Sequence, residues 1–261
     1  MIITVIIIGI LGLIIGSFLN VVVYRLKKGG EIVWRRSYCP KCEHSLNYRD
    51  LVPLFSFLYM GGKCRYCHSA ISWQYPLVEL TTAIIFILGY LKYLYPSSIL
   101  EGNATDQLLV YVTFLIFSSF LLIIFVYDLK HYLILDKVTI PALIVALVLN
   151  YWLGMPLLNL ILAAVVVAGF FLLQFIVSAG KWIGGGDIRL GLVMGVMLGW
   201  PKVLVALFLA YILGAVLGLS LIALKKKQWH SQLPFGTFLS LATVITLLYG
   251  EGLLAWYLSS I

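Results

Sequence analysis

The amino-acid sequence predicts an all-α protein, a polytopic membrane helix bundle of about eight transmembrane helices with one polar loop that binds zinc. Composition is the first observation, because 62% of the 261 residues are hydrophobic, only 11% are charged and the mean hydropathy is +1.06. A soluble domain of this length needs more polar surface. The second observation is a series of apolar runs near the length of roughly 20 residues that crosses a bilayer. The third is that all 4 cysteines lie in one polar segment.

Eight apolar runs are predicted to form membrane-spanning helices. The first is interpreted as a retained helix rather than a cleaved signal peptide, because it has no charged leader and continues past Gly16-Ser17 to Tyr24. The fourth and sixth runs are the shortest. The predicted helices cover residues 2–24, 77–95, 108–127, 138–153, 158–178, 188–200, 202–223 and 238–257.

The polar segment divides the chain into three parts. We expect a first transmembrane helix at 1–24, a cytoplasmic zinc-binding loop at 25–76 and a transmembrane core at 77–261. Within that core, Gly191, Gly195 and Gly199 recur at a spacing that lets membrane helices approach closely. The helix that carries them is therefore expected to lie deep in the bundle.

Basic residues indicate the orientation in the membrane. If the N-terminus lies outside, all of the 18 Lys and Arg residues except Lys92 and Lys202 lie in or next to cytoplasmic loops. Such an excess is typical of the cytoplasmic side. The net charge of +8 then reflects topology and anionic lipid. We therefore expect membrane lipid as a partner and no nucleic acid.

The loop carries two CxxC pairs, Cys39 with Cys42 and Cys64 with Cys67. Four thiolates complete a tetrahedral Zn²⁺ site. The loop is expected in the cytoplasm, where disulfides do not persist, which favours a metal over bridges. A redox pair would need a strand–helix context around one CxxC motif. Because a closed four-thiolate site leaves no open position, the zinc is expected to be structural.

Two aspartates lie at the predicted cytoplasmic ends of helices. Asp128 closes the run at 108–127, and Asp187 follows Gly184-Gly185-Gly186. Carboxylates at such positions are costly in a membrane protein and indicate a functional site. Two of them can share one proton and activate a water, as in aspartic proteases. Glycines beside Asp187 allow a substrate strand to pass close to its carboxylate.

Other interpretations of these residues remain open. An aspartate at a helix end can simply be a cap or an interfacial charge, as expected for Asp136. An ion-coupled membrane transporter would use Asp128 and Asp187 as proton sites near the bilayer midplane. A non-catalytic assembly factor would use the zinc loop to recruit partners.

Several motifs together resemble the type IV prepilin peptidases, membrane aspartic proteases of the GxGD type. The resemblance covers nearly the whole chain. Three departures from the family pattern are Leu135 and Thr237, where the family usually has proline, and Lys27, where it often has proline. The matching motifs are GSFLNVVVYRL at 16–26, the two CxxC pairs, Tyr127-Asp128, GGGDIR at 184–189 and Pro234-Phe235-Gly236.

The resemblance implies an enzyme of the bacterial plasma (inner) membrane, with Asp128 and Asp187 as its catalytic residues. Such enzymes cut the leader peptide from prepilin and pseudopilin precursors on the cytoplasmic side. Members with the cysteine loop commonly also methylate the new N-terminal residue with S-adenosylmethionine. Glu79, near the start of the second predicted helix, is the candidate for the methyl-donor site, and an interfacial charge is its alternative.

Overall fold

The computed structural model describes residues 2–29, 36–95, 104–226 and 233–259. In these ranges the regular elements are nine α-helices and one 3₁₀ helix, which confirms the all-helical prediction. Two of the basic loop residues, Arg35 and Lys227, lie outside the described residues. The chain divides into two compact units, residues 1–101 and residues 102–261, and each is described by itself.

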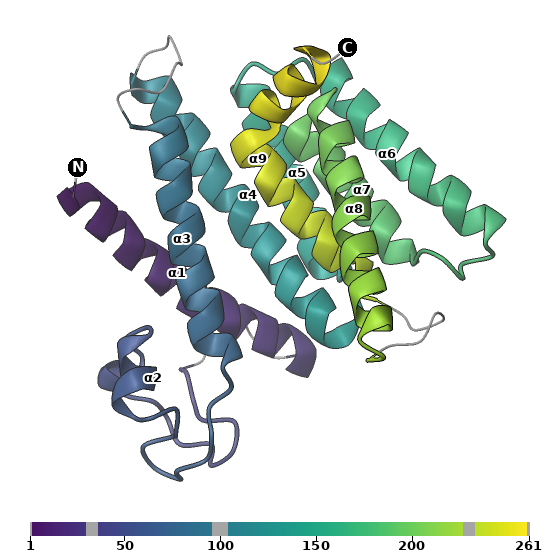
Figure 1. Cartoon of the computed structure of the whole chain (residues 1–261). Helices are drawn as coiled ribbons and strands as arrows, with labels where there is room; N and C mark the ends of the chain where they lie inside the picture. Colours follow the sequence, from purple (N-terminus) through teal and green to yellow (C-terminus); the bar gives the residue numbers. More distant parts are fainter. Residues whose placement is uncertain (1, 30–35, 96–103, 227–232, 260–261) are drawn as a thin grey trace. The chain divides into compact units, whose positions relative to one another are not determined.

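The first unit consists of two long helices and the polar loop between them. Helices α1 and α3 pack closely because small residues lie where they meet (Figure 1). A Cβ atom on Gly12 would lie 2.5 Å from the Cα atom of Ala83, and one on Gly16 would lie 2.7 Å from that of Glu79. The elements of this unit are α1 (Ile2–Lys28), the 3₁₀ helix (Tyr48–Asp50), α2 (Phe55–Tyr59) and α3 (Gln74–Tyr93).

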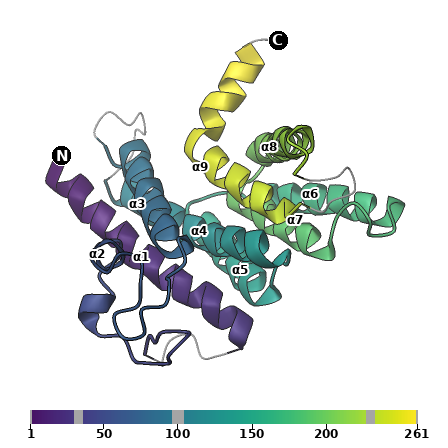
Figure 2. The ribbon, with the colours of Figure 1, turned by 60° about the horizontal axis from the view of Figure 1, so that its bottom comes forward.

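The second unit is a bundle of six helices with α7 at its centre (Figures 1 and 2). Helix α7 packs against α5, α6, α8 and α9. A Cβ on Gly195 would lie 2.3 Å from the Cα of Ala164, and one on Gly191 would lie 2.8 Å from the ring of Phe171. These contacts confirm that α7 lies deep in the bundle. The helices are α4 (Ala104–His131), α5 (Asp136–Trp152), α6 (Leu157–Val177), α7 (Gly185–Leu198), α8 (Lys202–Ala223) and α9 (Phe235–Ser259).

Each of the eight predicted apolar runs corresponds to one of these helices. Six of them are long and apolar enough to cross a membrane, namely α1, α3, α4, α6, α8 and α9. Helix α5 has 17 residues and α7 has 14, so α7 is only about 21 Å long at 1.5 Å per residue. Helices α1 and α4 continue past their apolar runs, to Lys28 and His131. Asp128 therefore lies within the last turn of α4.

Helices α5 and α7 run parallel to each other. At their starts, Asp136 forms an ion pair with Arg189. Near their ends, the side-chain amide of Asn150 donates to the carbonyl oxygens of Val196 and Met197. The start of α7, which carries Asp187, is thus held in register with the start of α5.

Candidate functional site

Asp128 is buried against the first turn of α9. Its Oδ2 atom accepts hydrogen bonds from the backbone N–H of Thr237 at 2.8 Å and from the Thr237 hydroxyl at 3.1 Å. The backbone N–H of Gly236 also interacts with this carboxylate. Because the first N–H groups of a helix have no partner inside the helix, a carboxylate is well placed there. The segment Pro234-Phe235-Gly236 therefore has a clear role, which is to present the start of α9 to Asp128.

Asp187 lies in the first turn of α7 itself. It is the third residue of that helix and is buried. Its Oδ2 atom accepts a hydrogen bond from the backbone N–H of Gly184 at 3.0 Å, while its own N–H donates to the Gly184 carbonyl at 3.1 Å. This reciprocal arrangement closes the glycine turn onto the carboxylate.

Ile134 connects the two aspartate sites. A Cβ on Gly186, the neighbour of Asp187, would lie 2.9 Å from the Cβ of Ile134. A Cβ on Gly236 would lie 2.7 Å from the Cδ1 of Ile134 and 3.0 Å from the Oδ2 of Asp128. The starts of α7 and α9 are thus packed on one side chain. Asp187 lies in the first turn of α7 and Asp128 is bonded to the first turn of α9, so both carboxyl groups lie at helix starts that contact Ile134.

Asp136 differs from its expected role as a helix cap. It is the first residue of α5, and the capping position belongs to Leu135, which makes no side-chain capping bond. The carboxylate of Asp136 instead pairs with Arg189 from the GGGDIR motif. Both side chains are about half exposed, so the pair adds little stability of its own, about 0–1 kcal/mol.

Two polar residues near the aspartates were not anticipated from the sequence. The side chains of Gln174 on α6 and Tyr211 on α8 are hydrogen-bonded at 2.8 Å. The Tyr211 ring lies edge-on to that of Phe235 at the start of α9, with 5.1 Å between centroids. A lone glutamine and tyrosine in apolar helices gave no spacing signal, so only the fold reveals their meeting.

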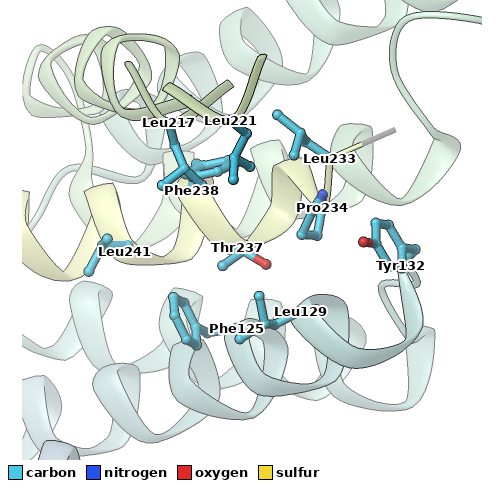
Figure 3. Close-up of a pocket in the computed structure, with 10 residues that line it drawn as sticks. All are labelled: Phe125, Leu129, Tyr132, Leu217, Leu221, Leu233, Pro234, Thr237, Phe238 and Leu241. Atoms are coloured by element: carbon cyan, nitrogen blue, oxygen red, sulfur yellow. The ribbon is translucent and has the colours of Figure 1, made fainter. Parts of the chain in front are cut away.

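An apolar pocket opens beside Asp128. Its volume is about 330 Å³, and Thr237, which holds Asp128, forms part of its wall (Figure 3). The other lining residues come from α4 and the residue that follows it, from α8, and from α9 and the two residues before it. They are Phe125, Leu129, Tyr132, Leu217, Leu221, Leu233, Pro234, Phe238 and Leu241.

The four cysteines form a cluster in the loop of the first unit. Their Sγ atoms all lie within 4.8 Å of one another, so the cluster is able to hold a metal ion. The Sγ atoms of Cys39 and Cys67 are 3.9 Å apart. A tetrahedral Zn²⁺ site with 2.3 Å bonds has a sulfur–sulfur separation of about 3.8 Å. The arrangement therefore fits a four-thiolate metal site.

The two CxxC turns have the same backbone structure. The N–H of Cys39 donates to the carbonyl of His44, and the N–H of Cys64 donates to that of Ser69. In each turn the residue after the second cysteine has a positive φ, 56° in Glu43 and 54° in His68. The two CxxC turns therefore match. The turn at Cys39–His44 is called the first knuckle, and the turn at Cys64–Ser69 is called the second knuckle.

One thiol of the cluster is disposed to ionise. The hydroxyl of Ser69 lies 3.1 Å from the Sγ of Cys67 and, with the Ser69 backbone, lowers the pKa of the Cys67 thiol to about 6. Metal-bound cysteine is a thiolate, so this contact suits a ligand.

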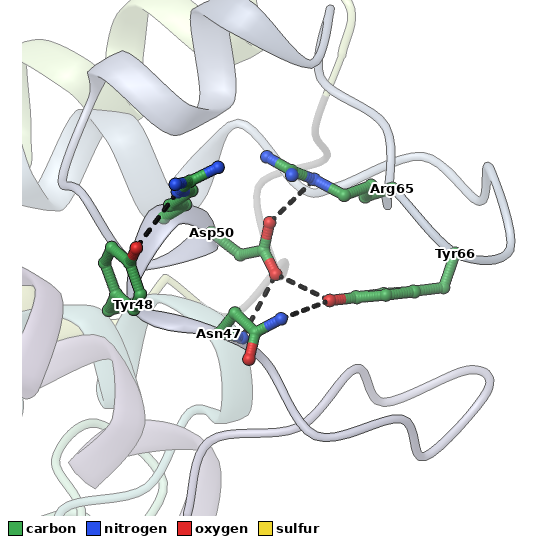
Figure 4. A network of polar contacts seen from close by, with 6 residues as sticks. Asn47, Tyr48, Asp50, Arg65 and Tyr66 are labelled. Carbon is green, nitrogen blue, oxygen red and sulfur yellow. Dashed lines mark hydrogen bonds and ion pairs between the residues drawn. The ribbon is translucent and has the colours of Figure 1, made fainter.

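A polar network ties the second knuckle to the rest of the loop (Figure 4). Buried Asp50 pairs with the Nε of Arg65 at 2.9 Å. It also accepts hydrogen bonds from the Tyr66 hydroxyl and from the Asn47 backbone, both at 3.1 Å. The Tyr66 ring packs on His44 of the first knuckle, with 3.7 Å between centroids. His44 is therefore engaged by an aromatic ring and does not belong to the cysteine cluster.

Glu79 is buried between α1 and the loop. Its Oε2 atom accepts a hydrogen bond from the backbone N–H of Leu54 at 2.7 Å, and the Ser17 side chain also bonds to it. Nearby, the side-chain amide of Asn20 donates to the Tyr75 carbonyl at 3.1 Å. The GSFLN motif thus packs on the start of α3. In this arrangement the Glu79 carboxylate is bonded to the Leu54 N–H and the Ser17 side chain, and its part in holding a methyl donor stays a prediction.

Comparison with known proteins agrees with these features. Residues 10–93 match the bacterial peptidase A24 N-terminal domain, and residues 115–219 match the type IV leader peptidase family. All four cysteines fall in the first range and both aspartates fall in the second. No solved structure matches the chain.

Three relatives illustrate the similarity, and each is called a prepilin leader peptidase/N-methyltransferase. The chain is 32% identical to the protein of Aeromonas salmonicida (strain A449), over 95% of this chain and 92% of the relative. It is 30% identical to that of Pseudomonas aeruginosa, over 95% and 91%. It is also 30% identical to that of Bacillus subtilis (strain 168), over 95% and 96%.

Proposed function

The chain belongs to the prepilin leader peptidase/N-methyltransferase family, peptidase A24, and on this premise we propose that it removes the leader peptide of type IV prepilin-like precursors as an aspartic endopeptidase. The observation that supports the proposal is the placement of Asp128 and Asp187. Each is buried, each is bonded to backbone N–H groups at a helix start, and Ile134 packs against both helix starts.

The hydrogen bonds suggest different roles for the two carboxyl groups. Two close carboxylates do not both stay ionised cheaply, so one of them holds a proton. Asp128 receives two bonds from Thr237 and one from Gly236, whereas Asp187 receives one from Gly184. Because donors favour the ionised form of a carboxyl group, we assign Asp128 as the base and Asp187 as the acid.

The reaction then follows as proton transfer around a scissile peptide. Asp128 takes a proton from a water molecule as the water oxygen bonds to the peptide carbonyl carbon, and Asp187 donates its proton to the carbonyl oxygen. When the carbon–nitrogen bond breaks, Asp128 returns its proton to the leaving nitrogen, and Asp187 recovers one from the intermediate. The pair ends in its starting state.

The pocket beside Asp128 suits the apolar part of the substrate. Apart from the hydroxyls of Tyr132 and Thr237, its wall is made of aliphatic, phenylalanine and proline side chains. According to the family resemblance, cleavage leaves an apolar residue at the new N-terminus of the product. We propose that this residue enters the pocket while the scissile bond lies at the aspartates.

The proposed enzyme crosses the bacterial plasma membrane eight times, with its N-terminus outside. Helices α5 and α7 are shorter than the other six, yet they run parallel, with Asp136 and Arg189 paired at one end and Asn150 bound to α7 at the other. The polar starts of both helices, and hence the aspartates, would face the cytoplasm, where leaders are accessible.

Zinc is the metal that we propose for the cysteine cluster. Four thiolates at nearly tetrahedral spacing match a structural Zn²⁺ site with no open position. Cys39, Cys42, Cys64 and Cys67 would hold the two knuckles together, and no step of catalysis passes through them.

Methylation of the new N-terminus is the second activity that we propose. S-adenosylmethionine would supply the methyl group, and Glu79 would act by holding Leu54 and the loop in place. We expect Glu79→Gln, which keeps an acceptor for the Leu54 N–H, to retain methylation, and Glu79→Ala to lose it while cleavage continues. Loss of methylation in Glu79→Gln would instead indicate a direct contact of the Glu79 charge with the donor.

The central test is leader cleavage by the purified protein in detergent or liposomes. A prepilin with its leader would be mixed with wild type, Asp128→Asn and Asp187→Asn, and its size would be followed on a gel. Wild-type cleavage with no product from either folded variant supports the aspartate pair. Normal cleavage by either variant would exclude it.

A transporter remains the alternative from a different class. Its proton sites would lie near the middle of spanning helices, whereas Asp128 is in the last turn of α4 and Asp187 in the first turn of α7. Proton-coupled uptake into liposomes, lost in both Asn variants while the wild type cleaves no prepilin, would favour that alternative.

A further inference from the structure

The loop of the first unit exposes a cluster of large apolar side chains. Phe55, Leu58 and Tyr59 lie on one face of α2 and are 65%, 62% and 87% exposed, and Trp73 is 68% exposed. These four residues are called the aromatic patch. Phe57 points the other way and is buried, with its ring 5.0 Å from that of Trp73. The short helix is therefore packed inward through Phe57, and among the residues that the structure describes its outer face is exposed.

A hydrogen bond connects the start of α2 to α3. The N–H of Leu54, directly before α2, donates to the Glu79 side chain at 2.7 Å. Glu79 lies roughly 7 Å along α3 from its first residue, at 1.5 Å per residue. Helix α3 is long and apolar enough to span a membrane. Helix α2 therefore lies beside the first turns of a helix that can cross the bilayer (Figure 1).

Helix α3 also exposes a row of apolar side chains. On α3 the side chains of Leu77, Leu80 and Ile84 are exposed, as expected for a helix in contact with acyl chains. Trp73 directly precedes α3 and joins this surface to α2 through Phe57. Tryptophan and tyrosine are enriched at the boundary between headgroups and acyl chains, because their rings are apolar and their polar atoms remain hydrated.

The charged residues of the loop between positions 36 and 73 also suit a place at the membrane surface. Asp50, one of the two acidic residues between positions 36 and 73, is already paired with Arg65. A four-thiolate Zn²⁺ site would carry a charge of −2, so the segment keeps a small excess of positive charge, which favours anionic headgroups. The basic residues of this segment are Arg36, Lys41, Arg49, Lys63 and Arg65, against the acidic residues Glu43 and Asp50.

We propose that the aromatic patch lies in the membrane interface and docks the cysteine loop onto anionic phospholipid. Helix α2 would lie in the plane of the bilayer surface, with Phe55, Leu58 and Tyr59 among the headgroups and upper acyl chains. The loop would then be held at the surface by the Glu79–Leu54 bond from within and by lipid from outside. This proposal needs only that α3 crosses the membrane, and it is independent of the protease activity.

The test places a photoreactive benzoyl-phenylalanine at single positions of the full chain. The protein would be reconstituted in liposomes of phosphatidylethanolamine and phosphatidylglycerol, irradiated and analysed by mass spectrometry. Positions 58 and 59 probe the patch. Leu77, exposed on α3, is the control in contact with lipid, and Glu43, exposed in the first knuckle, is the control in water.

We expect the yield of lipid adducts from probes at Leu58 and Tyr59 to approach the yield from the probe at Leu77. It should exceed the yield from the probe at Glu43 by about tenfold, because an interfacial helix buries its apolar face among the lipids. Adduct levels at 58 and 59 equal to the level at 43 would overturn the proposal. Cross-linking of 58 to a second copy of the chain, or to an added prepilin, in place of lipid would also overturn it and would identify the patch as a protein interface. Two probe positions guard against misfolding of either variant.

Discussion

Thr237 donates both its backbone N–H and its hydroxyl to the same carboxylate oxygen of Asp128, at 2.8 and 3.1 Å. The two residues are 109 positions apart in the chain, on α9 and α4. Where the family pattern has proline at this position, neither bond can form. This chain therefore adds two donors to one of its paired aspartates, and the effect on catalysis can be measured.

Thr237→Val removes the hydroxyl and keeps the backbone donor. A hydrogen bond of this kind contributes about 0.5–1.5 kcal/mol, so we expect kcat for leader cleavage to fall by about two- to tenfold. Because the ionised form of Asp128 loses a donor, the acidic limb of the pH–rate profile should move to higher pH. Thr237→Pro removes both donors and should move that limb further, since proline is tolerated in a first helical turn.

Thr243→Val is the matched control for this series. Thr243 is a buried threonine of the same helix, and its hydroxyl donates to the Leu239 carbonyl, away from Asp128. The Thr243→Val variant should lose about as much stability as Thr237→Val and keep the wild-type pH–rate profile. If Thr237→Val also kept that profile, Thr237 would have no influence on the ionisation of Asp128.

The Thr237–Asp128 contact is also an example of a feature that the sequence did not predict. Apolar runs predicted all eight long helices because hydrophobicity over about 20 residues is a local signal. The cysteine cluster was predictable for the same reason, since each CxxC pair forms its own turn. Thr237 carried no such signal, because its role depends on α4 and α9 packing together. Arg189, the partner of Asp136, was missed for the same reason.

The glycines before Asp187 are predicted to differ in their tolerance of a side chain. A Cβ on Gly186 would lie 2.9 Å from the Ile134 Cβ, whereas a Cβ on Gly185 would meet nothing within 4 Å. Gly186→Ala should therefore destabilise the protein by about 1–3 kcal/mol through overpacking and displace Asp187, with loss of cleavage. Gly185→Ala should retain both. Thermal unfolding and cleavage assays compare the two, and equal behaviour would show that Ile134 does not restrict the turn.

Leu135 should accept the proline that the family pattern has there. Its φ of −91° and ψ of 131° lie in the extended region that proline also adopts, and it precedes the first residue of α5. Leu135→Pro should leave cleavage unchanged and stabilise the protein by about 0.4–1 kcal/mol, because proline restricts the unfolded chain. A chemical denaturation curve measures this change. Destabilisation would mean that the Leu135 side chain or N–H is needed between Asp128 and α5.

The pocket beside Asp128 can be filled without touching either aspartate. Leu221 on α8 lines the pocket, and Leu221→Trp adds about the volume of several methylene groups to it. If the apolar residue after the cleavage site binds there, KM for a prepilin should rise about tenfold or more while kcat stays near that of wild type. Leu219→Trp, on an exposed part of α8 outside the pocket, is the control. An unchanged KM in Leu221→Trp would place the substrate elsewhere.

The cysteine cluster is predicted to hold one zinc ion per chain in the purified protein. Cys42→Ser should lower the zinc content severalfold, because an alcohol does not replace a thiolate ligand. It should also make the loop around the knuckles sensitive to added protease, since metal binding and local folding are coupled. His44→Ala is the matched variant, because His44 adjoins the first knuckle but packs on Tyr66 and lies outside the cluster. Metal analysis should find full zinc in His44→Ala, and a loss there equal to that in Cys42→Ser would show that the four cysteines alone do not make the site.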